Sequence, residues 1–324
     1  MKPLRSLSWL TVSVLLIPPQ GLTSPTTVAP GIHLISGTAT AGVQPDGNSI
    51  IIDAPDGLIV VDTGRHSAHT QQVIDFAVAA GRPVRAIVNS HWPLDHVGGN
   101  VLLRARYPDA EVYASSAING ALGGFLADYH KQLETILARP DTSPELADSL
   151  HAEISLIDSG PALQPTRVIS HSGRQTIAGR PLDIHLERAA VTAGDVWIFD
   201  PKTRVLISGD LVTLPAPFLD TACPARWAEA LAHLASQRYE WLVPGHGAPM
   251  RPADLETYRT AFAHLLACSN DKQHPDFECS DGWLRDSGRL IPDTDRAYAR
   301  TLLQFYISNV LRGDPAKLAS PCKV

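Results

Sequence analysis

Apolar residues in the first part of the chain occur in short runs that glycine and aspartate turns separate. Short β-branched runs bounded by such turns are typical of strands. Three of them predict strands, at residues 31–36, 49–52 and 58–61. A helical spacing of apolar residues follows at 67–80, and a buried strand is predicted at 84–88.

The pattern becomes strongly helical in the middle of the chain and then returns to strands. A helix is predicted at 97–106, and residues 115–158 are rich in Ala, Leu, Glu and Lys, with a Pro- and Asp-containing break at 140–144. This composition predicts a helical insertion, a pair of helices, beside the main fold. Further apolar runs predict strands at 167–170, 181–186, 196–199 and 205–208, and helices at 225–236, 252–266 and 294–311.

Strands followed by helices therefore occur twice. A sheet with helices on one face must bury its other face, and two such halves can do so by packing sheet to sheet. We predict an α/β fold of this kind, with a single domain over residues 25–324.

The N-terminal residues 1–24 predict a secretory signal peptide. Lys2 and Arg5 precede an apolar run from Leu7 to Ile17, and small residues and prolines follow it. The run is too short to cross a bilayer comfortably, which takes about 20 residues. We expect cleavage, a periplasmic or secreted mature chain, and no stable membrane span; a retained anchor is the alternative.

Composition and charge narrow the classes of partner. The 324 residues are 44% hydrophobic, enough for a large core, and the net charge is −6 without any run of Lys or Arg. Nucleic-acid binding needs a basic surface, so no nucleic-acid partner is expected. A small-molecule substrate or a protein partner fits better, and the oligomeric state stays open.

Four cysteines lie in the part of the chain expected to be exported. An even number in an oxidising compartment favours two disulfides, for which three connectivities exist. Cys268 and Cys279 would close a short loop and leave Cys223 to pair with Cys322.

Candidate chemistry begins on the segment between the strand at 84–88 and the next helix. His91, Asp95 and His96 lie on this segment. Imidazole and carboxylate are ligands of catalytic zinc, and a loop at the end of a rigid strand can direct them to one ion. Taken alone, the segment could equally hold a helix-capping aspartate beside a surface histidine.

Two further strand ends carry the same residue types. The apolar run 204–210 ends in Ser-Gly-Asp210, and the run 241–247 ends in Pro-Gly-His246-Gly. Each alone could be a turn residue, but three strand ends that each deliver Asp or His predict a metal site. The predicted ligands are His91, Asp95, His96, Asp210 and His246.

These segments, in this order, resemble the metallo-β-lactamase superfamily. Residues 57–64 resemble its first motif, in which Asp62 is expected to orient the metal loop, and residues 91–96 its histidine motif. Residues 190–195, 208–210 and 244–247 resemble the later ligand segments. The resemblance implies a four-layer αββα sandwich, zinc as the cofactor and hydrolysis as the activity.

The departures from the family pattern concern one of its two zinc positions. Pro93 and Val191 stand where the family has histidines, so the first position keeps only His91, with Asp210 as a bridge. The second position keeps Asp95, His96, His246 and Asp210. We therefore predict one zinc ion, unless His171 or His185 supplies a ligand, although both are more typical of ordinary strand histidines.

Two functions remain on this evidence. The first is a zinc-dependent hydrolase of a small ester, lactone, lactam or thioester, with Asp95 and His91 as catalytic residues and His91 as a general base. The second is a binding or regulatory protein that has lost catalysis on the same fold. The Pro-rich segment 214–220 is interpreted either as a wall of the substrate cleft or simply as a rigid loop.

Overall fold

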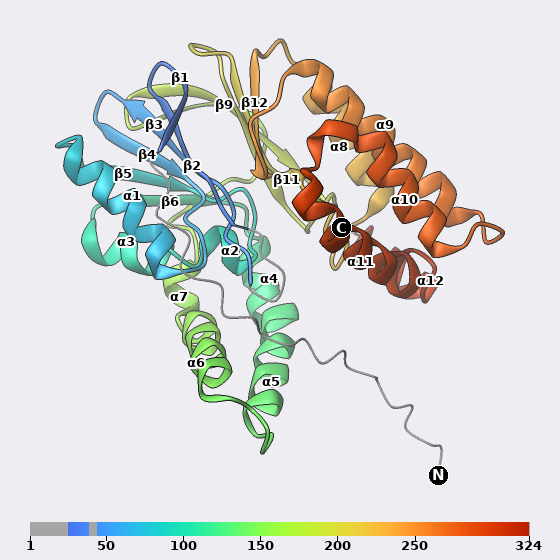
Figure 1. The fold of residues 1–324 in the computed structure, drawn as a ribbon. Helices are drawn as coiled ribbons and strands as arrows, with labels where there is room; N and C mark the ends of the chain where they lie inside the picture. The colour runs from blue at the N-terminus through green and yellow to red at the C-terminus, as the bar shows by residue number, and fades with distance from the viewer. Residues whose placement is uncertain (1–24, 39–43, 324) are drawn as a thin grey trace.

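Two β-sheets lie face to face, and helices cover both outer sides (Figure 1). The computed structural model describes residues 25–38 and 44–323. The predicted signal peptide, residues 1–24, lies outside the described residues. Within them, no helix is both long enough and apolar enough to cross a membrane.

The first sheet has seven strands in chain order, and its connections change in the middle. The strands β1 to β4 pair antiparallel, and from β4 to β7 they pair parallel. A helix or a longer crossover follows each of the strands β4, β5 and β6, because parallel neighbours need a return across the sheet face. The strands are β1 (Thr26–Ala29), β2 (Ile32–Ile35), β3 (Ser49–Ala54), β4 (Gly57–Val61), β5 (Val84–Val88), β6 (Glu111–Ala114) and β7 (Arg167–Val168).

The second sheet has five strands in the order β12-β11-β10-β9-β8. The pairs are antiparallel except for β11 and β12, which run parallel with helix α8 (Pro224–Ala235) between them in sequence. The strands are β8 (Gly173–Ile177), β9 (Arg180–Glu187), β10 (Asp195–Asp200), β11 (Val205–Thr213) and β12 (Trp241–His246).

The core between the sheets is aliphatic and fully buried. Ile59 and Val61 of the first sheet belong to the same buried cluster as Ile198 and Ile207 of the second. Burial of apolar surface contributes roughly 25 cal/mol of stabilising free energy per Å², so this layer holds the two halves together. Together with the helices outside, it makes the predicted four-layer αββα sandwich, and the fold prediction is confirmed.

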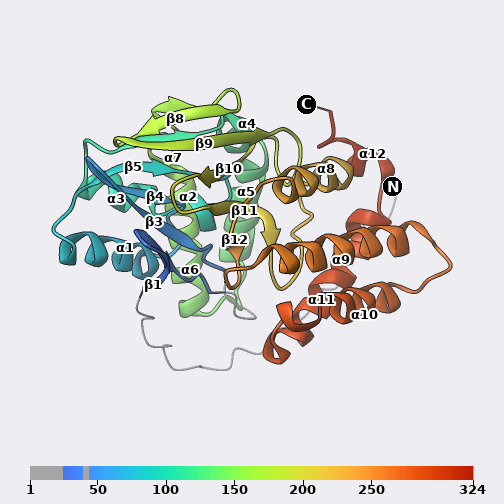
Figure 2. The same cartoon turned by 90° about the horizontal axis from the view of Figure 1, so that it is seen from above.

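The outer helices cover each sheet with a separate cluster. The helices α1 (Ser67–Ala79) and α3 (Asn100–Arg106) lie over the first sheet, with Val73 and Leu103 packed in one cluster with Val60. Figure 2 shows α8, α9 (Pro252–Asn270), α10 (Asp276–Ser287) and α11 (Arg296–Tyr306) gathered on the other side of the sandwich.

The predicted helical insertion is an arm that projects from the sandwich (Figure 1). Its helices are α4 (Ala117–Gly123), α5 (Phe125–Leu137), α6 (Pro144–Asp158) and α7 (Gly160–Leu163). Leu126 and Leu133 on α5 share a buried cluster with Leu150 and Ile157 on α6. Since Trp92 belongs to the same cluster, the arm is packed directly onto the loop that follows β5.

Several boundaries differ from those predicted. The helix expected at 97–106 is split into α2 (Leu94–Val97) and α3 by two glycines, and that expected at 294–311 is α11 followed by a π-helical turn at 307–311. The strands β1, β6 and β8 and the helix α10 were not predicted. The α10 sequence is polar, and its buried side chains are only recognisable once α9 lies against it, because the two make extensive contact.

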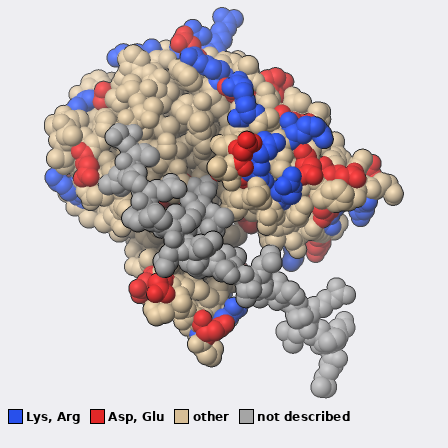
Figure 3. Space-filling view, in the orientation of Figure 1, with Lys and Arg blue, Asp and Glu red and all other residues tan. Residues whose placement is uncertain are grey.

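Two disulfides fasten the C-terminal helices, and both are the expected pairs. Cys268 on α9 joins Cys279 on α10, and Cys223 at the start of α8 joins Cys322, which follows α12 (Pro315–Ala319). On the face shown in Figure 3, Lys and Arg mingle with Asp and Glu over this helical side of the molecule.

Candidate metal centre

The loop after β5 brings Asp95 and His96 to one point. Asn89 to Pro93 form the loop, and α2 begins at Leu94, so that Asp95 and His96 occupy its first turn. Both side chains are buried, with His96 0% exposed. The backbone N–H of His96 bonds the Pro93 carbonyl, which closes this turn tightly.

Asp62 fixes the direction of the His96 ring. It has a left-handed backbone (φ 57°), which is uncommon for a residue with a side chain. Its Oδ2 accepts from His96 Nδ1 at 2.9 Å, and its Oδ1 accepts from the Ser90 backbone N–H at 2.7 Å. With the proton on Nδ1, His96 Nε2 carries a free lone pair, the usual state of a metal-binding imidazole.

Ser90 fixes the state of His91 in the same way. Its hydroxyl donates to Asp62 Oδ2 at 2.6 Å, so the Ser90 oxygen can only accept from His91 Nδ1, which lies 2.9 Å away. The lone pair of His91 is therefore on Nε2, 3.6 Å from Asp210 Oδ2. This nitrogen is a ligand or a proton acceptor.

Asp210 enters the site from inside β11, where pairing with β12 is irregular. The sequence predicted that the strand ends at 208, but β11 continues to Thr213 with a break in register around Gly209 (φ 51°). This bulge turns the Asp210 carboxylate toward the first sheet's loop. A Cβ on Gly245 of the neighbouring strand would lie 1.9 Å from Asp210 Oδ1, so only glycine fits there.

His246 is the last residue of β12, and Asn48 holds the chain around it. The Asn48 amide donates to the carbonyls of Pro244 and Gly247, both at 2.9 Å. Phe218 packs edge-on against the His246 ring, with centroids 5.5 Å apart. His246 Nε2 therefore faces the carboxylates of Asp95 and Asp210.

Three ligand atoms lie within reach of one zinc ion, and a further carboxylate lies beside them. The ligand atoms of Asp95, His96 and His246 are all within 4.8 Å of one another, which leaves a fourth position open for water. His246 Nε2 and His96 Nε2 lie 3.0 and 3.4 Å from Asp95 Oδ2, and 3.6 and 3.3 Å from Asp210 Oδ1. Zinc bonds of about 2.0–2.2 Å place tetrahedral ligand atoms about 3.3–3.5 Å apart. The residues present therefore fit a zinc ion at the second metal position.

The same atoms lack other partners. Three of them, His96 Nε2, His246 Nε2 and Asp210 Oδ1, are buried without a hydrogen bond, and so is His91 Nε2. The 3.0 Å contact of His246 with Asp95 does not supply donor geometry, so the two atoms meet as acceptors. Several unpartnered buried acceptors at one point are costly unless a cation joins them.

The electrostatics keep both carboxylates ionised. Burial alone would raise the pKa of Asp95, but the neighbouring His96 and the close approach of His246 hold that pKa well below its usual range. For Asp210 the histidines His246 and His96 likewise outweigh burial and lower the pKa. Asp95 and Asp210 therefore present the charged oxygens that zinc prefers.

The positions of the replaced histidines lie beside His91. Pro93 and Val191 both line the cavity with His91, and neither side chain can coordinate a metal. The suggested substitutes are elsewhere: His185 stacks on Trp197 at 3.6 Å, and His171 is exposed and paired with Ser170. Neither belongs to a group of possible ligands in the described part of the chain.

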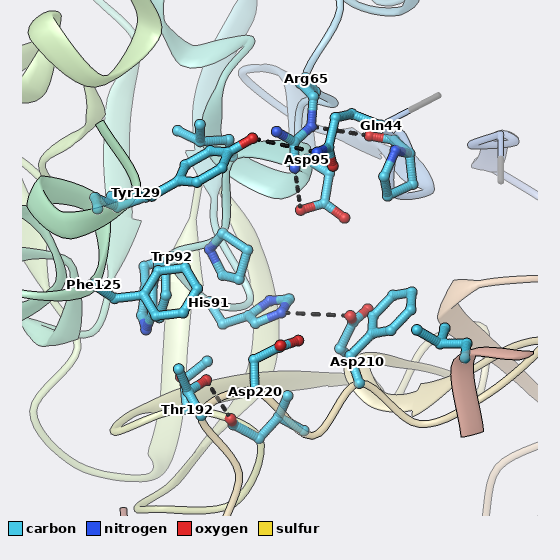
Figure 4. Close-up of a pocket in the computed structure, with 18 of the residues that line it drawn as sticks. Gln44, Arg65, His91, Trp92, Asp95, Phe125, Tyr129, Thr192, Asp210 and Asp220 are labelled. Carbon is cyan, nitrogen blue, oxygen red and sulfur yellow. Dashed lines mark hydrogen bonds and ion pairs between the residues drawn. The ribbon is translucent and has the colours of Figure 1, made fainter. Parts of the chain in front are cut away.

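A cavity of about 340 Å³ opens over the site. Figure 4 shows His91 in its centre, with Asp210 and Asp220 on one side and Tyr129, Arg65 and Asp95 on the other. The segment 214–220 does contribute to the wall, through Phe218 and Asp220. Other lining residues include Trp92, Phe125, Leu126, Thr192, Thr221, Tyr298, Leu302 and Tyr306.

Sequence reasoning missed Arg65 and Tyr129, and it included Asp220 only as part of a segment that could be a wall of the cleft. Arg65 follows directly on the Asp62 motif, which was a possible signal, but nothing local marks Tyr129.

Asp220 is held by a hydrogen bond from a C-terminal helix. The Tyr306 hydroxyl donates to Asp220 Oδ2 at 2.5 Å. Desolvation raises the pKa of the Asp220 carboxyl, and Tyr306 opposes the rise. Because Asp220 is open to the cavity, solvent limits this effect.

Comparisons with known proteins identify the family of this chain and several similar proteins. The profile described as "Metallo-beta-lactamase superfamily" matches residues 43–246. The linear primary-alkylsulfatase of Pseudomonas sp. (strain ATCC 19151) is 25% identical over 242 residues, which are 66% of this chain and 45% of that protein. A hydroxyacylglutathione hydrolase of Synechococcus sp. (strain JA-3-3Ab) is 46% identical over 54 residues, 17% of this chain and 21% of that protein.

Solved structures show the same fold. A stereoselective inverting sec-alkylsulfatase from Pseudomonas sp. has a TM-score of 0.60 at 20% identity and covers 91% of this chain and 52% of its own. A metallo-beta-lactamase from Pontibacter korlensis has a TM-score of 0.54 at 19% identity, with 74% of this chain and 98% of its own covered. The chain thus spans about half the length of the two alkylsulfatases.

Proposed function

Because the chain belongs to the metallo-β-lactamase superfamily, we propose that it is a zinc-dependent hydrolase with a single metal ion. Its substrate is a small ester, lactone, lactam or thioester. We further propose that residues 1–24 are a signal peptide and that the mature protein acts in the periplasm or outside the cell. Two disulfides and the absence of free cysteines in the described residues support an oxidising compartment.

One observation carries the proposal. Asp95, His96 and His246 direct three buried ligand atoms to one point, with Asp210 beside the two imidazoles. The other metal position has Pro93 and Val191 where the family has histidines. A protein that only binds a partner has no need of these costly buried groups. The intact set therefore favours catalysis over a degenerate binding role.

Zinc at this position would polarise the reacting carbonyl and lower the pKa of a water. His91 is not needed as a ligand, and its free Nε2 accepts the proton of the attacking water. The water oxygen bonds to the carbonyl carbon, the bond from that carbon to the leaving oxygen, nitrogen or sulfur breaks, and His91 returns the proton to the leaving group. Ser90 keeps His91 in the tautomer that this needs.

A second candidate is the hydrolysis of an alkyl sulfate. It is favoured by the similarity to two alkylsulfatases, one of which aligns over 91% of this chain. Both candidates use an apolar cavity beside a metal, and they differ in the charge of the substrate.

Metal analysis of the mature protein tests the proposal. We expect about one zinc per chain, as one complete catalytic site holds a single ion. Zinc should be lost in Asp95→Ala and in His246→Ala and retained in His185→Ala, which removes a histidine that stacks on Trp197 and belongs to no group of possible ligands in the described residues.

Other results would overturn parts of the proposal. Two zinc ions per chain would contradict the single-metal site. No zinc under zinc-replete conditions would contradict the hydrolase and support a binding protein on the same fold. With one zinc, a screen of p-nitrophenyl esters, lactones, lactams and alkyl sulfates identifies the substrate class.

A further inference from the structure

The wall of the cavity is apolar on two opposite sides. Phe125 and Leu126 come from α5 of the arm, and Tyr298 and Leu302 come from α11 of the C-terminal helices. Phe125 also packs on the Trp92 ring, with centroids 5.2 Å apart. An acyl or alkyl chain of a few carbons can lie between these two sides with most of its surface buried.

Arg65 is the cation that lines this cavity, and it is already neutralised. Its Nη1 forms an ion pair with Glu153, its Nη2 lies 3.5 Å from Asp95 Oδ1, and its Nε donates to the Pro45 carbonyl at 3.2 Å. The side chain is only 8% exposed. No other Lys or Arg of the described part lines the cavity.

The remaining charges do not favour an anion either. The two positive charges of a zinc ion would be balanced by Asp95 and Asp210. Asp220 adds another carboxyl group on the far wall, held by Tyr306. A carboxylate or sulfate in this cavity would lose its hydration without gaining an unpaired cation, which is unfavourable.

We propose that the site selects uncharged substrates: a neutral carboxylic ester or lactone whose apolar chain packs between α5 and α11. This rests on the proposed hydrolase function and narrows its substrate class. The charges of the cavity disfavour anionic substrates, including the alkyl sulfates of the second candidate function.

Glu153 is the specificity-determining residue of this arrangement. It lies on α6 of the arm, is 5% exposed, and also accepts a hydrogen bond from Tyr129 at 3.3 Å. The arm therefore supplies both an apolar wall and the carboxylate that neutralises Arg65. Without the charge of Glu153, Arg65 would have a positive charge free to attract an anion in the cavity.

A matched pair of esters tests this. p-Nitrophenyl hexanoate and mono-p-nitrophenyl adipate share the leaving group and chain length, but adipate ends in a carboxylate. We expect kcat/KM of the zinc-loaded protein to be at least about tenfold higher for the hexanoate, because the cavity does not pair the extra charge. Hexyl sulfate should be cleaved more slowly than the hexanoate.

Glu153→Gln probes the cause, and Glu145→Gln is its control. Glutamine keeps the size and an acceptor for Tyr129 but frees the charge of Arg65, so the preference for hexanoate should fall about tenfold. Glu145 is exposed on the same helix, so its variant makes the same charge change away from the cavity and should leave the preference unchanged. Asp220→Asn should also reduce the preference, and it serves as a second variant should Glu153→Gln not fold.

Binding measurements test this inference independently of the proposed hydrolase activity. Calorimetry with zinc-free protein should show tighter binding of octanamide than of octanoate, and Glu153→Gln should narrow the difference. Equal kcat/KM for the two esters, or faster cleavage of adipate or hexyl sulfate, would overturn the inference. If no ester, lactone, lactam, thioester or alkyl sulfate is cleaved, the hydrolase is wrong, and the calorimetry alone decides whether the cavity prefers uncharged ligands.

Discussion

Single residues set the geometry of the centre through close approach. Gly245 leaves the space that Asp210 Oδ1 occupies, and Asp62 accepts bonds from both Ser90 and His96. These residues are not ligands, but each decides where a ligand atom lies. Partners of this kind commonly change metal affinity by about 10- to 100-fold when they are altered.

We expect Gly245→Ala to weaken zinc binding by about tenfold or more. Its Cβ would lie 1.9 Å from Asp210 Oδ1 and 2.8 Å from the Asp210 backbone nitrogen, so the ligand must move. Zinc competition with a chromophoric chelator measures the effect. Gly120→Ala is the control, since its Cβ would meet no atom within 4 Å, and an unchanged zinc affinity in Gly245→Ala would contradict the role of this glycine.

Elements added to the sandwich form both sides of the cavity. The arm packs onto the loop after β5 through the cluster around Trp92, and α11 approaches from the C-terminal helices. The latter are fastened by disulfides: Cys223 and Cys322 are separated by 99 residues, and Cys268 and Cys279 by 11. The disulfide between Cys223 and Cys322 joins the residues after α12 to the start of α8, which closely follows the cavity-lining segment 214–220.

The two disulfides should differ in their effect on stability. Constraining the unfolded chain stabilises by about 4.7 kcal/mol for a loop near 100 residues and about 3 kcal/mol for one near 15. The double variant Cys223→Ala/Cys322→Ala should therefore lose more free energy of unfolding than Cys268→Ala/Cys279→Ala. Urea denaturation of both variants measures this, and a larger loss from the short loop would contradict it.

The whole molecule brings its two halves together at the metal. Asp95 and His96 follow the first sheet, whereas Asp210 and His246 belong to strands of the second. A metal at this point would cross-link the halves in addition to the aliphatic layer between the sheets. A ligand that binds only the folded state stabilises it by mass action.

Removal of zinc should therefore lower the melting temperature. At a free zinc concentration of 100 times Kd the gain is about 2.7 kcal/mol, which corresponds to a shift of roughly 4 °C for a chain of this size. Scanning calorimetry with zinc and with a chelator measures the shift. Asp95→Ala should melt at the same temperature in both; a zinc-dependent shift in this variant would mean that the ion binds elsewhere.

The sequence determined much of the sandwich and the chemistry of the centre. Asp95 and His96 occupy one helical turn, and the loss of ligands at Pro93 and Val191 follows from their side chains alone. The β-branched runs and helical spacings likewise placed most elements, because these patterns depend on near neighbours. Weakly patterned segments such as α10 were not predicted, since the burial of their side chains depends on contact with α9.

Only the tertiary structure decided what surrounds the metal site. Arg65 and Glu153 are 88 residues apart, and Asp220 and Tyr306 are 86 apart, yet each pair meets at the cavity. No spacing in the sequence encodes such contacts, because they arise when the arm and the C-terminal helices pack against the sandwich. The bulge in β11 could not be predicted for the same reason, because it is defined by the pairing of β11 with β12. This bulge turns Asp210 toward the loop of the other sheet.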